Sequence, residues 1–235
     1  MNWSVIDNVL DWVVPDREQC RKAAADFAEQ NPGKTPEELA RKAIGSAQTW
    51  AAAAGGATGA AANPLIMVPA ALADMAAVLR IEGVMAGTVA ALLDPASLDD
   101  PQTFQADVVT IIFPGAVSQA LRQIGVRWGR QMTQELIRRY FTEGLTKSVT
   151  ALASRYLFVH VTEKALVSKT VPLVGAGIGA GWNYLELKAV GNRAIRYYQH
   201  KGIGPSDKPT KGERVKAVAS RVVKWRNGQG KKRLP

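Results

Sequence analysis

The chain has 235 residues and is poor in several residue types on which common enzymes and secreted proteins depend. Cys20 is its single cysteine, so no disulfide can form within the chain, and a reducing, cytoplasmic setting is expected. His160 and His200 are the only histidines, too few and too far apart in sequence to indicate a metal site or a catalytic triad. Aromatic residues make up 7% of the chain and alternating β-type patterns are scarce, which disfavours a sandwich or barrel.

Nucleotide-binding motifs are incomplete as well. Gly175-x-Gly177 has no acidic residue where a dinucleotide site would bind the ribose, because Glu186 and Asp207 are poorly placed for it. No Gly-Lys-Ser/Thr follows the glycines, as a phosphate-binding loop requires. The sequence therefore predicts no cofactor and no bound metal.

Three carboxylates near prolines could supply an acid and a base: Asp94, Asp99 and Asp100. The prolines at 95 and 101 favour their interpretation as helix caps instead. We therefore predict a protein without catalytic residues. An enzyme would be favoured if Asp74, Arg80 and Asn183 met in a closed polar pocket.

Alanine and glycine are abundant, which favours closely packed helices. We predict an all-α fold, a compact bundle of about seven to nine helices with Gly/Ala-rich buried helical hairpins and a basic C-terminal helical tail. Residues 1–34 should form N-terminal helices packed on the body, residues 35–200 the main helical domain, and residues 201–235 a basic linker and amphipathic tail. A linker composition at 202–207 marks the last boundary.

Local signals predict where several helices begin and end. Asp16 with Gln19 forms an N-cap pair, and Thr35-Pro36-Glu37-Glu38 forms a complete capping box with proline at the first helical position. Asp94-Pro95 should end one helix, and Asp100-Pro101 should start the next. After Pro114-Gly115, one long helix is expected to continue to Phe141, with an apolar face opposite a strongly basic one.

Between Lys42 and Asp74 there are 31 consecutive residues without charge, more than the roughly 20 that a helix needs to cross a bilayer. Two predictions follow from this length. Asn63, Pro64 and a further proline at 69 interrupt the run, which favours a buried helical hairpin that bends at Gly59 to Pro64. A transmembrane pass is the alternative.

The stretch from Thr170 to Tyr184 also has no charged residue, and from 175 to 181 it carries a glycine at every second position. On a helix these glycines open two grooves in which a neighbouring backbone can approach closely. We predict that this stretch is the packing centre of the fold. The residues assigned to these structural glycine grooves are Gly175, Gly177, Gly179, Gly181 and Asn183.

The net charge of +10 is concentrated at the C-terminus. From Lys201 onward there are eleven basic residues and two acidic ones, or +9, which leaves +1 for the preceding 200 residues. Val215, Val218 and Val222 would line one side of a short helix here. The residues predicted to bind an anionic surface are Lys211, Arg214, Lys216, Arg221, Lys224, Trp225, Arg226, Lys231, Lys232 and Arg233.

Five features follow one another along the chain: the capped Thr35-Pro36 helix, the uncharged Ala/Gly-rich segment, the helix of Asp74 to Arg80, Asp99-Asp100-Pro101, and Val171-Pro172-Leu173-Val174-Gly175-Ala176-Gly177-Ile178-Gly179 with Asn183. In this order they resemble the EcsC family of bacterial proteins, over roughly Thr35 to Tyr198. The resemblance implies a helical bacterial protein that is associated with membranes and linked in name to an ABC-transporter operon. It supplies no catalytic residues.

Two non-catalytic functions fit these observations. The first is a membrane-associated helical protein at the inner face of the cell membrane, which binds anionic lipid or a membrane-protein partner. The second is a soluble scaffold or nucleic-acid-binding protein that uses the same basic tail. Because the tail has only Trp225 for base stacking and no nucleic-acid motif, lipid or protein is the favoured partner. The sequence gives no signal for an oligomeric state.

Overall fold

The computed structural model describes residues 9–59, 64–126, 133–168 and 172–199, with side chains at 9–54, 73–126, 133–155, 157 and 180–199. These residues are helical and include no strand, which confirms the predicted all-α class. The helices are α1 (Val9–Val13), α2 (Arg17–Glu29), α3 (Pro36–Gly59), α4 (Pro64–Leu93), the 3-10 helix η2 (Pro95–Leu98), α5 (Pro101–Ile112), α6 (Pro114–Gln123), α7 (Gln134–Tyr140), α8 (Glu143–Ser168) and α9 (Pro172–Tyr198). The chain divides into two compact units, Met1–Pro205 and Ser206–Pro235, and the helices belong to the first.

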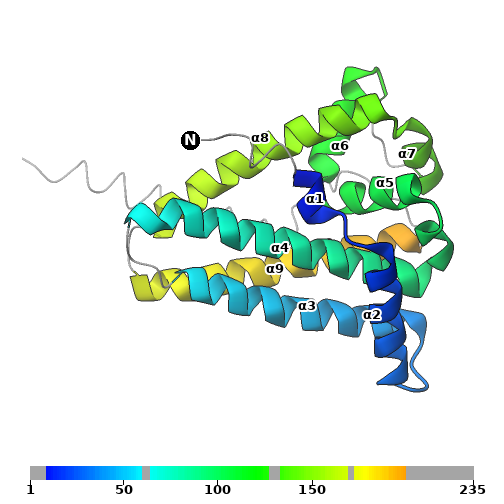
Figure 1. Cartoon of the computed structure of the whole chain (residues 1–235), viewed down its shortest axis with the longest axis horizontal. Coiled ribbons are helices and arrows are strands. Elements are labelled where there is room, and N and C mark those ends of the chain that lie inside the picture. The colour runs from blue at the N-terminus through cyan, green and yellow to red at the C-terminus, as the bar shows by residue number, and fades with distance from the viewer. Residues whose placement is uncertain (1–8, 60–63, 127–132, 169–171, 200–235) are drawn as a thin grey trace, which may run out of the picture. The chain divides into compact units, whose positions relative to one another are not determined.

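Three long helices, α3, α4 and α9, form the largest packed element of the fold (Figure 1). α3 packs along α9 and against α4, and α4 also contacts α1, α2, α5, α8 and α9. α1 and α2 pack on α4. The short helices α5, α6 and α7 gather at the end of the layer where α4 ends (Figure 1).

Three of the predicted caps are present, at Asp16, Thr35 and Asp100. Thr35 Oγ1 accepts a hydrogen bond from the Glu38 backbone N–H at 3.3 Å, and Glu38 Oε2 accepts from the Thr35 backbone N–H at 2.9 Å, which completes the capping box of α3. Asp16 accepts from the Gln19 backbone N–H at 2.8 Å at the start of α2, and Asp100 accepts from the Thr103 backbone N–H at 2.7 Å at the start of α5. These local signals were sufficient to place the helix starts.

The prediction of one long helix from Pro114-Gly115 to Phe141 is wrong. α6 ends at Gln123, and Gly125 follows with a φ of +80°, in the left-handed region that glycine adopts readily after a helix. α7 then starts anew at Gln134, where Thr133 Oγ1 accepts a hydrogen bond from the Leu136 backbone N–H. A helix-ending glycine and a new N-cap therefore divide the apolar pattern into two helices.

α4 is the one helix among the described residues that is long and apolar enough to cross a membrane by itself, over Ala73–Leu93, and the bent pair α5 and α6 passes the same test together. More than half of that α4 segment is buried inside the protein, however. Asp74 and Glu82 are buried on it as well. Packing against several helices accounts for the apolar character of Ala73–Leu93, and α3 and α4 form the hairpin predicted on either side of residues 60–63.

Among the glycines whose surroundings the structure describes, close helix contacts occur at two positions of α4 and at one position of α9. A Cβ added to Gly83 would lie 1.9 Å from the carbonyl oxygen of Val13, and one added to Gly87 would lie 2.3 Å from Cys20 Sγ. A Cβ on Gly191 would lie 2.6 Å from the Ile44 side chain. The two α4 glycines therefore let the N-terminal helices approach the centre of the layer.

Replacing Gly83 with alanine should lower the free energy of unfolding, because the nearest atom is backbone and cannot rotate away. Overpacking of this kind costs about 1–3 kcal/mol. Gly45 is the matched control, a glycine inside α3 whose added Cβ would meet no atom within 4 Å. Gly45→Ala should raise the free energy of unfolding by up to about 1 kcal/mol through helix propensity. Chemical denaturation of both variants measures the two effects, and equal shifts would contradict the close contact at Gly83.

Candidate functional site

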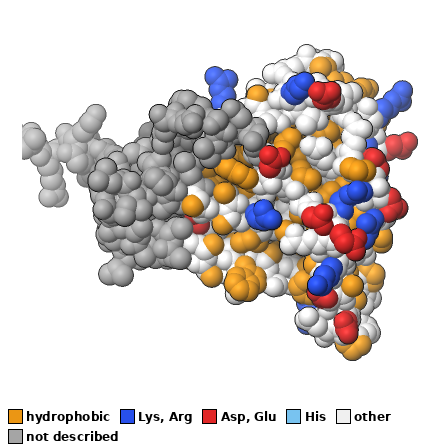
Figure 2. All heavy atoms as spheres, viewed as in Figure 1, with side chains coloured by type: hydrophobic (Ala, Val, Ile, Leu, Met, Phe, Trp, Pro, Cys, Tyr) orange, Lys and Arg blue, Asp and Glu red, His pale blue; other side chains and the backbone are white. Residues whose placement is uncertain are grey.

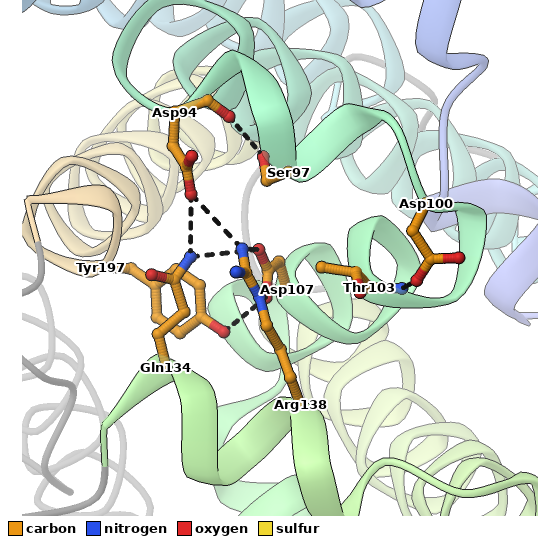
Figure 3. A network of polar contacts seen from close by, with 8 residues as sticks. All are labelled: Asp94, Ser97, Asp100, Thr103, Asp107, Gln134, Arg138 and Tyr197. Atoms are coloured by element: carbon orange, nitrogen blue, oxygen red, sulfur yellow. Dashed lines mark hydrogen bonds and ion pairs between the residues drawn. The ribbon is translucent and has the colours of Figure 1, made fainter.

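The carboxylate of Asp107, on α5, is the centre of a buried polar network (Figure 3). Its side chain has an exposed fraction of 0%. Arg138 on α7 donates to both carboxylate oxygens, from Nε to Oδ1 at 3.0 Å and from Nη2 to Oδ2 at 2.5 Å. Tyr197 on α9 donates its hydroxyl to Oδ1 at 2.6 Å. Three helices distant in sequence thus meet at one carboxylate.

Two more residues extend this network toward the surface. Gln134 Nε2 donates to Asp107 Oδ2 at 3.3 Å and to Asp94 Oδ2 at 3.4 Å. Arg138 NH2 also lies 3.4 Å from Asp94 Oδ2. The side chains of Arg138 and Asp94 are 27% and 20% exposed, whereas the side chain of Asp107 is fully buried. Asp94 therefore accepts side-chain donors from α7 and makes no side-chain cap on η2, which corrects its predicted capping role.

The protonation states follow from burial and from these partners. Burial raises the pKa of Asp107 above its ordinary value, and the hydrogen bonds from Arg138 and Tyr197 oppose that shift. Burial and the Asp107 charge raise the pKa of Tyr197 well above its ordinary value, so the phenol keeps its proton and remains a donor. The Tyr197 ring also meets Tyr198 edge to face, with centroids 5.2 Å apart.

This arrangement is better suited to joining helices than to catalysis. Both carboxylate oxygens of Asp107 accept hydrogen bonds from within the protein, and the guanidinium of Arg138 donates to each of them. A general base needs an oxygen within reach of a substrate proton. Among the described residues, no group of three or more His, Cys, Asp or Glu could hold a metal ion. The network is therefore interpreted as a clamp between α4, α5, α7 and α9.

An enzyme would have been favoured if Asp74, Arg80 and Asn183 met in one polar pocket, and only two of the three residues meet. Asn183 Nδ2 donates to Asp74 Oδ1 at 3.4 Å and to the carbonyl oxygen of Ala51 at 3.1 Å. Asp74 and Asn183 are both buried, whereas Arg80 is exposed on α4. The amide of Asn183 therefore ties α9 to α3 and α4 at one level, and Arg80 lies outside this group.

Residues 172–184 of the glycine stretch lie in α9, which packs along α3 in a steady antiparallel register. Gln199 donates a hydrogen bond to Glu37, and Gly191 lies against the side chain of Ile44. Further along, the Tyr184 carbonyl accepts from the side chain of Gln48, and the side chain of Asn183 donates to the Ala51 carbonyl. Extended along both helices, this register places the backbone of 176–179 opposite the end of α3. The surroundings of Gly175, Gly177 and Gly179 are not among the described side-chain environments.

Gly181 can be compared with its prediction. It is exposed, and a Cβ added there would meet no atom within 4 Å. The close approach expected at this glycine is therefore absent, because Gly181 lies on the side of α9 that faces away from the neighbouring helices. Asn183, two residues later, lies on the packed side and has a structural role.

The residues predicted to bind an anionic surface, from Lys211 to Arg233, all lie outside the described residues. Their role remains a prediction from charge. The network around Asp107 was not predicted. The signal available for it was a single carboxylate inside the apolar run from Phe104 to Phe113, a position where a charge requires partners.

Comparison with known proteins gives no relative: no protein-family profile, no curated protein and no solved structure matches the chain.

Replacing Arg138 with methionine should lower the free energy of unfolding by about 3 kcal/mol, because it leaves the buried Asp107 carboxylate without its cation. Arg139, the next residue, is exposed, and Arg139→Met should change stability by less than about 0.5 kcal/mol. The double variant Arg138→Met with Asp107→Asn should be more stable than Arg138→Met alone, since the unpaired charge is gone. Urea denaturation measures all three. An unchanged midpoint for Arg138→Met would show that the pair does not hold α5 to α7.

Proposed function

We propose that the chain is a non-catalytic, membrane-associated helical protein that binds anionic lipid at the inner face of the cell membrane through its basic C-terminal stretch. The observation that carries this proposal is the distribution of charge: +9 of the +10 lies beyond residue 200. Each Lys or Arg near an anionic surface contributes about 1 kcal/mol to binding. The resemblance to the EcsC family points in the same direction.

The body supports this division of roles. Its most deeply buried ionic group, Asp107, is occupied by partners from within the chain. Exposed basic residues of the body are in part paired with neighbouring acids, as in Arg41 with Glu37 and Lys147 with Glu143. The C-terminal stretch has nine more basic than acidic residues and cannot balance its charge locally. Attraction to a polyanion is therefore expected from this stretch.

The test uses the full chain and vesicles that contain an anionic phospholipid. Changing Lys216, Arg221 and Lys224 to glutamine should weaken binding roughly 100-fold at low salt, from about 1 kcal/mol for each charge. The matched control changes Lys22, Arg41 and Lys147 to glutamine, which removes the same charge from exposed positions of the body. The control should lose less than about threefold. Co-sedimentation across a salt series measures both, and binding should weaken as salt rises.

Two outcomes would contradict the proposal. Equal losses in the two triple variants would mean that net charge matters and the C-terminal stretch does not. Failure of the full chain to bind anionic vesicles, together with tight binding to single-stranded or duplex nucleic acid in a mobility-shift assay, would favour the soluble alternative.

A further inference from the structure

One side of α4 is open to solvent where it borders α3. Ala73, Ala77 and Arg80 are exposed and follow one another at intervals of four and three residues, so they share one side of the helix. Gly87, two turns after Arg80, lies on the same side, and there α2 covers it, because an added Cβ would lie 2.3 Å from Cys20 Sγ. α2 also contacts α3. The open side of α4 is therefore the one that continues onto α3.

Trp50 is the large side chain at this border. Its exposed fraction is 70%, higher than that of any other large hydrophobic side chain in the described part of the chain. Ala43 and Ala47 precede it by seven and three residues on the same side of α3 and are buried and half-buried. α9 meets a different side of α3, that of Ile44 and Gln48. Trp50 thus lies at the edge of the side of α3 that packs on α4. We term Trp50, Ala73, Ala77 and Arg80 the hairpin face.

The members of the hairpin face are close enough to touch one surface together. Asn183 donates to the Ala51 carbonyl and to Asp74, which sets these two positions of α3 and α4 at one level. Trp50 lies one residue from that level, and Arg80 lies six. At a rise of about 1.5 Å per residue, the two are separated by about 8 Å along the helices.

Arg80 is the one exposed charge in this part of the hairpin. Among the described side chains of α3 after Lys42 and of α4 as far as Leu93, the other charged residues are Asp74 and Glu82, and both are buried. The exposed charge is therefore positive and lies among alanines. A partner that complements it must be anionic and must also offer apolar atoms.

The rest of this surface is apolar. The α4 segment Ala73–Leu93 is apolar enough to cross a bilayer, yet little more than half of it is buried inside the protein. On the visible face in Figure 2, most charged side chains gather at the side away from the grey atoms, and the region between carries apolar side chains and few charges. Apolar surface is thus left in contact with water beside Arg80.

A phospholipid surface offers both kinds of atom. Tryptophan is enriched at the boundary between lipid headgroups and hydrocarbon, where its ring contacts acyl chains and its N–H contacts polar groups. A guanidinium matches the geometry of a phosphate and binds it through paired hydrogen bonds. Ala73 and Ala77 have short side chains, which do not hold the helix away from such a surface.

We propose that the hairpin face lies on the surface of an anionic membrane, with Trp50 at the boundary of headgroups and hydrocarbon and Arg80 bound to lipid phosphate. The inference rests on the proposed membrane association. It goes further because it assigns a lipid contact to the helical body, through residues other than the basic C-terminal stretch.

A matched pair of labels tests which side of the body meets the membrane. A nitroxide is attached to Ala77→Cys, in the hairpin face, or to Asn192→Cys, an exposed position of α9, in the full chain. Cys20 is buried and its pKa is raised to about 12, so the native thiol reacts slowly. Collisions with oxygen and with a water-soluble nickel complex report exposure to lipid and to water.

On vesicles of phosphatidylcholine and phosphatidylglycerol, the label at 77 should gain collisions with oxygen and lose collisions with nickel, whereas the label at 192 should stay exposed to nickel. If both labels stay exposed to nickel on vesicle-bound protein, the hairpin face is wrong and attachment by the C-terminal stretch stands. Absence of vesicle binding would overturn both proposals. Protection of the label at 77 without vesicles, increasing with protein concentration, would identify a second copy as the occupant and overturn the lipid contact.

Substitutions give an independent measurement by co-sedimentation with the same vesicles. Arg80→Gln should weaken binding about fivefold, whereas Lys188→Gln, which removes an exposed charge from α9, should change it less than about twofold. Trp50→Ala should weaken binding roughly tenfold, and Tyr184→Ala, at an exposed aromatic of α9, less than about twofold. Equal losses within either pair would contradict the hairpin face and leave the role of the basic stretch untouched.

Discussion

The burial of the Asp107 carboxylate is the constraint on which the arrangement of the short helices depends. Transfer of a carboxylate from water to a protein interior costs several kcal/mol unless charge and hydrogen bonds are restored. Arg138, Gln134 and Tyr197 restore them only while α7 and α9 remain in place beside α5. If any one of these helices moved away, the buried carboxylate would lose part of its charge or hydrogen-bond partners. This end of the protein is therefore held together by all three helices at once, and not by apolar contact alone.

The opposite end of the three-helix layer is held by different forces. Its described polar contacts include the hydrogen bonds of Asn183 with Asp74 and Ala51 and that of Gln48 with the Tyr184 carbonyl, and the helices around them carry alanine and glycine. Contacts between small residues are dispersion contacts, which do not weaken when water is replaced by hydrocarbon. The ionic clamp at the other end depends instead on charge and hydrogen-bond partners for a buried carboxylate.

Much of the fold was predictable because helix starts are encoded within four residues, as in Thr35 to Glu38 and Asp100 to Thr103. The division between α6 and α7 was missed because apolar spacing continues across it, although Gly125 and Thr133 carried the stop and start signals. The Asp107 network joins residues 31 and 90 positions apart, which no local pattern can specify. Small residues permit close approach without enforcing it, so glycine spacing alone did not distinguish exposed Gly181 from closely packed Gly83.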